Sequence, residues 1–227
     1  MTTAGSDSGQ LVLWGVGTSR TIRPHWALAE LGLAYETRPI LPRTGETKTP
    51  EFTALTARQK IPLLVDGNLK LTESAAIMAY LSDRYASDAT ALVPRETVAR
   101  AQCLEWCFFI LSELDATSLY VIRRHRDLAA VYGAAPAVCD AAGDYFGLQM
   151  RSVERALGNG RAYLMGDRFT APDILLSTCL AWAIRYGVPV PAVARDYNLR
   201  VTARPAFALA TARNAPPTPM PTLGARS

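Results

Sequence analysis

The segment Lys60–Leu81, KIPLLVDGNLKLTESAAIMAYL, constrains the fold of this chain more than any other stretch. An apolar strand pattern runs over Ile61–Val65, Asp66-Gly67 marks a tight hairpin turn, and a second short strand follows at Leu69–Leu71. Proline cannot donate to a sheet ladder, so Pro62 belongs at the start of its strand, where a cis peptide is a recurring feature.

Glu73 and Ser74 come directly after this hairpin, at the N-terminus of a helix predicted from Ser74 to about Arg84. The unpaired N–H groups and the positive dipole end of a helix N-terminus favour an anion. This hairpin, followed by a helix with a polar N-terminus, therefore predicts a ligand site. The site would offer backbone hydrogen-bonding groups and an anion pocket.

The composition is that of a soluble globular protein, with 49% hydrophobic and 19% charged residues in 227. No apolar run approaches the roughly 20 residues of a membrane span, and the first ten residues, MTTAGSDSGQ, lack the features of a signal peptide. We expect residues 1–10 to be a disordered leader. The net charge of +4 comes from scattered arginines, which favours neither a nucleic-acid partner nor a membrane partner.

The four cysteines, Cys103, Cys107, Cys139 and Cys179, form no Cys-x-x-Cys pair, and the two histidines keep no metal-site spacing with them. We therefore predict no metal site. Cysteines in apolar runs read as small buried hydrophobes, and with the absent signal peptide they favour a reducing, cytoplasmic location.

Residues 11–86 alternate between strand and helix patterns. Strands are expected at 11–14 and 35–40, helices at about 20–31 and 51–55, and the hairpin with its helix completes the order β-α-β-α-β-β-α. Residues 87–96 read as a linker.

Beyond the linker the chain is predicted to be helical from 97 to 213. One long helix covers 97–122, a second covers 135–157, and a third begins at the capping sequence Thr170-Ala171-Pro172-Asp173. Shorter helices are expected at 191–197 and 205–212. The tail at 214–227 is rich in proline and is expected to be extended or disordered.

Four separate motifs in this order resemble those of the glutathione transferases, over residues 11–212. They are SRTIR with WALAELGLAYE (19–36), EF with KIPLL (51–64), LTES (71–74) and GDRFTAPD (166–173). The resemblance is to cytosolic, serine-type, theta-like or bacterial-like members. It implies an α/β plus all-α fold: an N-terminal thioredoxin-like domain followed by an all-helical C-terminal domain.

The resemblance also implies how glutathione is held. A cis bond before Pro62 would turn the N–H and C=O of Ile61 towards the cysteinyl backbone of glutathione, as in strand addition. Ser74 would hold the γ-glutamyl carboxylate, Glu73 would meet the ammonium, and Lys60 would approach the glycyl carboxylate. The family often has Asn-Pro-x-Gly before the lysine, whereas this chain has Thr-Ala-Arg-Gln at 56–59, so Gln59 or Lys48 is a further candidate at the glycyl end.

The thiol chemistry points to a hydroxyl group in the loop before the first helix. Ser19 matches the serine of the serine-type members, and its hydroxyl would stabilise the thiolate of glutathione. Thr18 and Thr21 offer the same chemistry, and a hydroxyl here can instead serve only as a helix N-cap. The loop has neither the tyrosine nor the cysteine used by other members.

The resemblance places the electrophile between the domains, against this loop and the long helix. By position the candidates are Val16, Trp106, Phe109, Ser112 and Tyr120. The leading hypothesis is a glutathione transferase that acts on a small hydrophobic electrophile and is a homodimer, with glutathione as co-substrate. The alternatives are a related glutathione-dependent dehalogenase, isomerase or peroxidase, or a non-catalytic glutathione-transferase-like binding or regulatory module.

Overall fold

The computed structural model describes residues 10–217. Residues 1–9 of the predicted leader and residues 218–227 of the predicted tail lie outside this range. Within it, the chain forms two compact units: residues 10–85 together with 206–217, and residues 86–205. The last helix therefore groups with the first unit, whereas the sequence analysis counted it with the helical domain.

The first unit is built on a four-stranded mixed sheet whose strands lie in the order β2-β1-β3-β4. The strands are β1 (Val12–Trp14), β2 (Glu36–Arg38), β3 (Leu63–Asp66) and β4 (Leu69–Thr72). Strand β1 runs parallel to β2 and antiparallel to β3, and β3 and β4 form the predicted hairpin with Gly67 and Asn68 at its tip.

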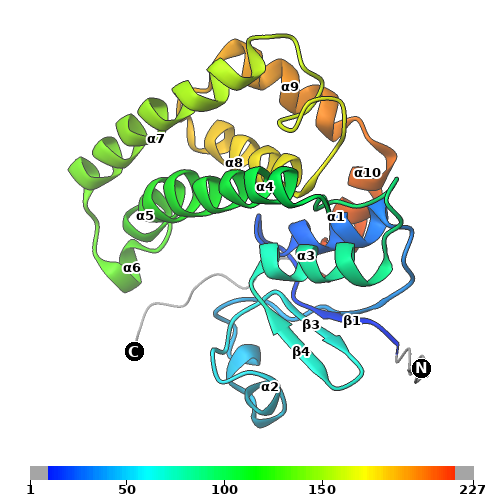
Figure 1. Cartoon of the computed structure of the whole chain (residues 1–227). Coiled ribbons are helices and arrows are strands. Elements are labelled where there is room, and N and C mark those ends of the chain that lie inside the picture. Colours follow the sequence, from blue (N-terminus) through cyan, green and yellow to red (C-terminus); the bar gives the residue numbers. More distant parts are fainter. Residues whose placement is uncertain (1–9, 218–227) are drawn as a thin grey trace. The chain divides into compact units, whose positions relative to one another are not determined.

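The helices of this unit are α1 (Ile22–Glu30), the short 3-10 turn η1 (Glu46–Lys48), α2 (Pro50–Leu55), α3 (Ser74–Tyr85) and α10 (Pro205–Arg213). Figure 1 shows α1 and α3 together on one side of the sheet and α2 on the other. The predicted order β-α-β-α-β-β-α is confirmed. Fully buried side chains from both layers, among them Leu13, Leu28, Leu64 and Ile77, form the core.

The hairpin is fastened to α3 by two tyrosines. The hydroxyls of Tyr80 and Tyr85 both donate to Oδ2 of Asp66, at 2.6 and 2.5 Å. Because Asp66 ends β3 and both tyrosines belong to α3, these bonds fix the outer end of the hairpin. Its other end carries Pro62 and Glu73.

The second unit is helical. It contains α4 (Thr97–Phe109), η2 (Ile110–Leu119), α5 (Tyr120–His125), α6 (Ala129–Tyr132), α7 (Pro136–Leu157), α8 (Ala171–Tyr186) and α9 (Ala192–Thr202). In Figure 1, α4, η2 and α5 follow one another as a continuous rod, with α7 alongside. Residues 171–180 of α8 are all buried, so this helix is the centre of the unit.

The long helix predicted over 97–122 differs from the structure in its hydrogen-bond pattern. Residues 110–119 are π-helical rather than α-helical. Within this segment, the hydroxyl of Ser118 donates to the carbonyl of Glu113 at 2.6 Å, and Asp115 is buried. Side chains that bond to the backbone of the preceding turn compete with the regular ladder, and such competition does not show in an apolar periodicity.

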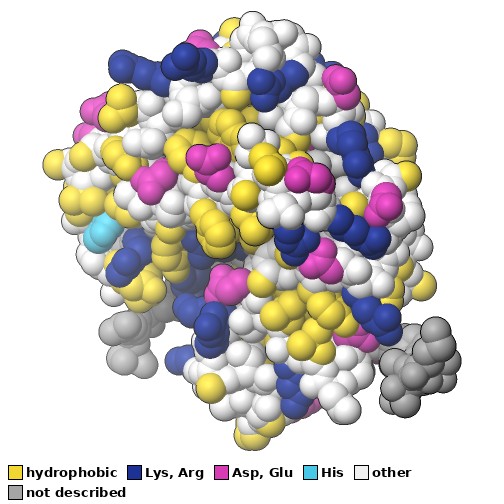
Figure 2. Space-filling view, viewed as in Figure 1, with side chains coloured by type: hydrophobic (Ala, Val, Ile, Leu, Met, Phe, Trp, Pro, Cys, Tyr) yellow, Lys and Arg dark blue, Asp and Glu magenta, His cyan; other side chains and the backbone are white. Residues whose placement is uncertain are grey.

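The structure's charge distribution agrees with the scattered arginines of the sequence. On the face shown in Figure 2, lysine and arginine side chains are interspersed with aspartate and glutamate. In the part of the chain that the structure describes, no helix has the length and apolar character needed to cross a membrane.

Candidate glutathione site

The strand register brings three predicted segments to one edge of the sheet. Trp14 pairs with Leu63, and Leu63 pairs with Thr72. Because both pairings are antiparallel, the chain leaves β1, enters β3 and leaves β4 at the same end. The loop that carries Ser19, the Ile61-Pro62 step and the Glu73-Ser74 step therefore lie at neighbouring positions.

Ile61 presents free backbone at this edge. Its peptide bond to Pro62 is cis, as the resemblance implied. Among the described residues, neither the N–H nor the C=O of Ile61 has a hydrogen-bond partner. An unpaired N–H and C=O on one residue at a sheet end are what an extended peptide needs for a short strand addition.

Gly15 lies directly against Ile61. A Cβ atom at Gly15, which has φ of +107°, would stand 2.6 Å from the Cβ of Ile61. Real Cβ atoms do not approach so closely, so only glycine fits here. This close approach couples the start of the β1–α1 loop to the residue that offers its backbone to a ligand.

Ser74 begins α3 and is only 7% exposed. The first helical bond runs from the N–H of Ile77 to the carbonyl of Glu73, at 2.9 Å, so the N–H groups of the first turn have no acceptor within the helix. In the described chain the Ser74 hydroxyl also has no hydrogen-bond partner. Several donors thus converge at the positive end of a three-turn helix, where a carboxylate is favoured.

Glu73 is held in an ion pair that the sequence analysis did not predict. Nη1 of Arg58 lies 3.0 Å from Oε1 of Glu73, and the two side chains are 64% and 72% exposed. Glu73 has φ of +68°, which turns the chain from β4 into α3. In the sequence Arg58 was noted only as part of a departure from the family pattern, and nothing there indicated its partner.

The three candidates for the glycyl end occupy the segment before the hairpin. Gln59 is part-buried, and its side-chain amide donates to Oγ1 of Thr53 at 3.1 Å, which ties the loop to α2. The side chains of Lys60 and Lys48 are exposed. The structure thus gives Gln59 a role in holding its loop and leaves both lysines in solvent.

Ser19 differs from its two hydroxyl-bearing neighbours. Oγ1 of Thr18 accepts from the N–H groups of Arg20 and Thr21, at 3.2 and 3.0 Å, and so closes the turn that precedes α1. Oγ1 of Thr21 donates to Oδ1 of Asn214 at 2.7 Å. Within residues 10–217 the hydroxyl of Ser19 has no hydrogen-bond partner and caps no helix. Of the three hydroxyls, only that of Ser19 is uncommitted.

His25 is a buried residue of this unit that the sequence analysis did not single out. Its Nε2 lies 3.2 Å from the carbonyl oxygen of Gly15, and its Nδ1 lies 2.8 Å from the hydroxyl of Tyr35. A carbonyl only accepts, so we assign the proton to Nε2, and Tyr35 then donates to Nδ1. Burial lowers the pKa of His25 to about 4, so the ring is neutral at pH 7. A buried helix residue thereby fixes the carbonyl of Gly15.

The five electrophile candidates are each placed within their own unit. Val16 is fully buried in the first unit. In the second, the rings of Trp106 and Phe109 meet edge to face at 5.7 Å on α4, and Tyr120 begins α5. Ser112 lies in η2, where its exposed hydroxyl donates to the carbonyl of Phe108 at 2.8 Å.

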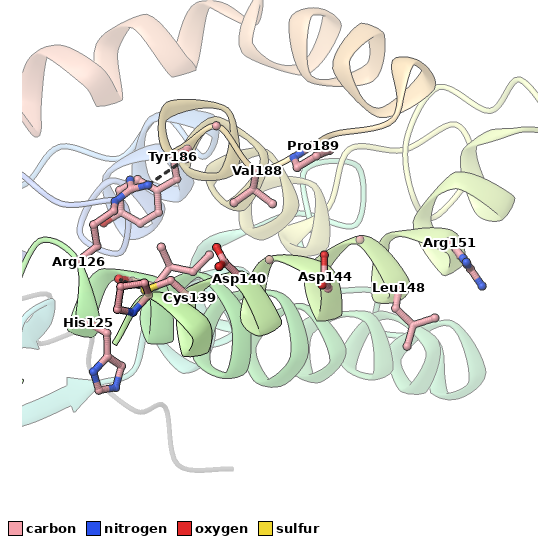
Figure 3. Close-up of a pocket in the computed structure, with 15 residues that line it drawn as sticks. His125, Arg126, Cys139, Asp140, Asp144, Leu148, Arg151, Tyr186, Val188 and Pro189 are labelled. Atoms are coloured by element: carbon pink, nitrogen blue, oxygen red, sulfur yellow. Dashed lines mark hydrogen bonds between the residues drawn. The ribbon is translucent and has the colours of Figure 1, made fainter. Parts of the chain in front are cut away.

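The second unit also contains a cavity of about 860 Å³ that the sequence analysis did not predict. In Figure 3, Asp140 and Asp144 of α7 lie opposite Tyr186, the last residue of α8, and Val188 and Pro189 of the α8–α9 connection. The guanidinium of Arg126 stacks on Tyr186 at 3.9 Å and donates to its carbonyl. None of the predicted site residues lines this cavity. In the described chain, no group of three or more metal-binding side chains is close enough to hold a metal ion.

Comparison with known proteins shows which family this arrangement belongs to. Residues 9–83 match the family model for the glutathione S-transferase N-terminal domain. Glutathione S-transferase 3 of Zea mays is 33% identical over 166 residues, which cover 72% of this chain and 73% of that protein. The chain therefore belongs to the glutathione S-transferase family.

Solved structures extend the likeness over most of the chain. The glutathione-bound theta-class glutathione S-transferase of Xanthomonas axonopodis pv. citri has a TM-score of 0.72 and 27% identity, and the match covers 87% of this chain and 94% of that one. A glutathione transferase family member of Pseudomonas fluorescens pf-5, solved with two glutathione molecules bound, has a TM-score of 0.79 at 22% identity, covering 92% and 95%. The predicted fold, a thioredoxin-like domain followed by an all-helical domain, is confirmed, and the relatives' names support its classification as a glutathione transferase.

Proposed function

We propose that this protein activates the thiol of glutathione for attack on a small hydrophobic electrophile. One observation carries the proposal: three uncommitted groups meet at one edge of the sheet. They are the backbone of Ile61, the hydroxyl and amides at Ser74, and the hydroxyl of Ser19. Glutathione is an extended tripeptide with a carboxylate at each end and a thiol between them. The Ile61 backbone suits its peptide backbone, the donors at Ser74 suit a carboxylate, and the Ser19 hydroxyl suits the thiol.

Recognition would use the hairpin end and the start of α3. The N–H and C=O of Ile61 pair with the cysteinyl backbone, and the donors at Ser74 hold the γ-glutamyl carboxylate. The ammonium beside that carboxylate meets Glu73, which exchanges its Arg58 partner for it. Because the Arg58–Glu73 pair is largely exposed, it contributes at most about 1 kcal/mol, and the exchange costs little.

Ser19 would supply the chemistry. A free thiol has a pKa of about 8.5 and is mostly protonated at pH 7, whereas the thiolate is the nucleophile. A hydroxyl that donates to sulfur stabilises the charged form and lowers the thiol pKa. The thiol gives up its proton to water, the thiolate forms a carbon–sulfur bond, and the leaving group departs with its electron pair. Ser19 stays protonated throughout and acts as a donor.

The test is turnover of a chlorinated nitrobenzene with glutathione by the wild type, Ser19→Ala and Ser19→Thr. A hydrogen bond to a charged group is worth about 1.5–3 kcal/mol, so we expect Ser19→Ala to lose about 10- to 100-fold in kcat. Ser19→Thr keeps a hydroxyl and should recover part of the activity. Unchanged kcat in Ser19→Ala would mean that another group activates the thiol.

Glutathione binding and turnover of a panel of electrophiles by the wild type distinguish the enzyme from the other functions considered. If the wild type binds glutathione but turns over no member of an electrophile panel, the binding-module hypothesis replaces the enzyme. Turnover of halogenated, isomerisable or peroxide substrates alone would assign the protein to the related glutathione-dependent reactions.

We also propose that the protein is a cytoplasmic homodimer, as the family resemblance implies. Its four cysteines are free, and three of them are buried, which fits a reducing compartment. Light scattering coupled to size exclusion measures the oligomeric state directly, and a monomer mass would contradict this part of the proposal.

A further inference from the structure

The loop that carries Ser19 is bound by one residue that lies far from it in the sequence. Asn214 follows α10 and makes three hydrogen bonds to this loop. Its carbonyl accepts from the N–H of Gly17 at 2.8 Å, its Oδ1 accepts from the hydroxyl of Thr21 at 2.7 Å, and its Nδ2 donates to the carbonyl of Thr18 at 3.4 Å. The three bonds bracket Ser19 on both sides and leave its hydroxyl uncommitted.

Asn214 is itself firmly placed. Its N–H donates to the carbonyl of Ala210, which continues the last turn of α10. The ring of Phe207 packs on Trp26 of α1 with centroids 4.7 Å apart, and the guanidinium of Arg213 lies 5.4 Å from the ring centre of Tyr35. Helix α10 is thus docked on the unit that contains the loop, and it brings the Asn214 amide to a defined position.

The start of the loop is held by other bonds, since the N–H groups of Gly15 and Val16 donate to the carbonyls of Arg38 and Ile40. Thr18 and Thr21 bond to each other across the turn, with their hydroxyls 3.0 Å apart, and the N–H of Thr18 donates to Oγ1 of Thr21 at 3.0 Å. These local bonds shape the turn but do not anchor it to the rest of the unit. The anchor on the side of Thr21 is Asn214.

We propose that Asn214 is a positioning residue for thiol activation: it fixes the loop so that the Ser19 hydroxyl reaches the sulfur of glutathione. This inference rests on the proposed function. A donor must be held within about 0.5 Å of its productive position to act on a reacting atom, so loss of the anchor should weaken activation more than binding. Within residues 10–217, no hydrogen bond joins Asn214 to Ile61 or Ser74, the residues proposed to recognise glutathione.

The test compares Asn214→Ala with the wild type in steady-state kinetics and in the ultraviolet absorbance of bound thiolate across pH. We expect kcat to fall about tenfold, KM for glutathione to stay within about twofold, and the thiol of bound glutathione to ionise at higher pH. Asn159→Ala, which removes an exposed asparagine of the second unit, is the matched control and should leave all three unchanged.

Thr21→Val removes the bond to Asn214 from the loop side, together with the bonds between the Thr21 hydroxyl and Thr18, and provides a second variant if Asn214→Ala does not fold. Because the two substitutions share one hydrogen bond, the double variant should lose less activity than the two single losses combined. Additive losses, an unchanged kcat, or equal changes in kcat and KM with no shift of the thiolate curve would overturn the inference. Failure of the proposed function is recognised separately, by an inactive wild type or an unaffected Ser19→Ala.

Discussion

Ser74 combines burial, a free hydroxyl and a helix N-terminus in one residue. A carboxylate bound there gains a hydroxyl donor as well as the amides of the first turn, whereas the amides remain when the side chain is removed. We therefore expect the Ser74 side chain to adjust the affinity of the proposed site rather than to create it.

Ser74→Ala should raise the KM for glutathione about tenfold and leave kcat at saturating glutathione within about threefold. The reason is that a hydrogen bond to a charged group contributes about 1.5–3 kcal/mol and is present in both ground and transition states. Steady-state kinetics at fixed electrophile measure both constants. Ser87→Ala, in an exposed turn of the other unit, is the control. A fall in kcat with unchanged KM would place Ser74 in the chemistry instead.

His25 should make stability depend on pH. Its folded pKa, about 4, lies below the ordinary value of 6.5, because burial outweighs the hydrogen bond to Gly15. Between these values the unfolded chain binds a proton that the folded chain does not, so stability falls as pH drops from about 6.5 towards 4. The slope is up to about 1.4 kcal/mol per pH unit.

Urea unfolding of the wild type and His25→Gln at pH 7, 6 and 5 measures this dependence. We expect the variant to be less stable at pH 7 but to show a flatter decline. His125→Gln, the same change at the chain's other histidine, keeps His25 and should keep the steeper decline. Parallel curves for the wild type and His25→Gln would show that other groups carry the dependence.

For single residues of the candidate site, the sequence predicted the residue types but not their hydrogen-bond and ion-pair partners. The sequence narrowed the thiol donor to Ser19, Thr18 and Thr21 but could not rank them by contact. Which of these hydroxyls is already hydrogen-bonded depends in part on Asn214, nearly two hundred residues away, because its Oδ1 accepts from the hydroxyl of Thr21. The ion pair of Arg58 was not predicted for the same reason, since its partner Glu73 lies at the other end of the hairpin sequence.

Among the elements, α8 has the most clearly encoded start. The predicted capping arrangement at 170–173 is confirmed, and the carboxylate of Asp173 accepts from the N–H groups of Thr170 and Leu164 at 2.7 and 2.8 Å. It also accepts from the hydroxyl of Tyr197 in α9 at 2.5 Å. Asp173 is fully buried, and burial raises its pKa. One carboxylate thus joins the start of α8 to a loop and to α9.

Asp173→Ala should destabilise the protein by about 3 kcal/mol or more, because it leaves several buried donors without an acceptor. Chemical denaturation monitored by circular dichroism measures the loss. Asp167→Ala, an exposed aspartate just before the same helix, should change stability by less than about 0.5 kcal/mol. Similar losses in the two variants would contradict the role given to the buried carboxylate.

Local signals predicted most elements because each depends on neighbours in the chain. The hairpin, α1, α3, α7 and α8 were located from the prolines and glycines at element boundaries, from capping residues and from the spacing of apolar residues. The π-helical segment η2 was missed because its pattern of apolar residues is also compatible with an α-helix. What distinguishes it is the bonding of Ser118 to the backbone and the burial of Asp115.

For the whole molecule, the most consequential feature is that α10 groups with the first unit. Its buried alanines, Ala206 and Ala210, and the ring of Phe207 face that unit, where Phe207 packs on the fully buried Trp26. Composition and periodicity identified α10 as a helix but could not say which unit it joins. That choice depends on the shape of the surface that receives it.

Phe207→Ala should lower stability by about 1–3 kcal/mol, since it removes a part-buried aromatic ring and its contact with Trp26. Thermal unfolding followed by tryptophan fluorescence measures the effect. We also expect lower kcat, because Asn214 would lose its support. Phe108→Ala, which removes a ring that is 66% exposed, is the control. Equal effects of the two substitutions would show that α10 does not stabilise the first unit.

The grouping of α10 with the first unit also sets an order of events during synthesis. Residues 10–85 leave the ribosome first, but their docking helix and Asn214 follow only after residues 86–205 have been made. At typical elongation rates this interval is on the order of ten seconds. The first unit must therefore wait with part of its apolar surface uncovered, and the loop that carries Ser19 is bound by Asn214 only after all of residues 86–205 have been synthesised.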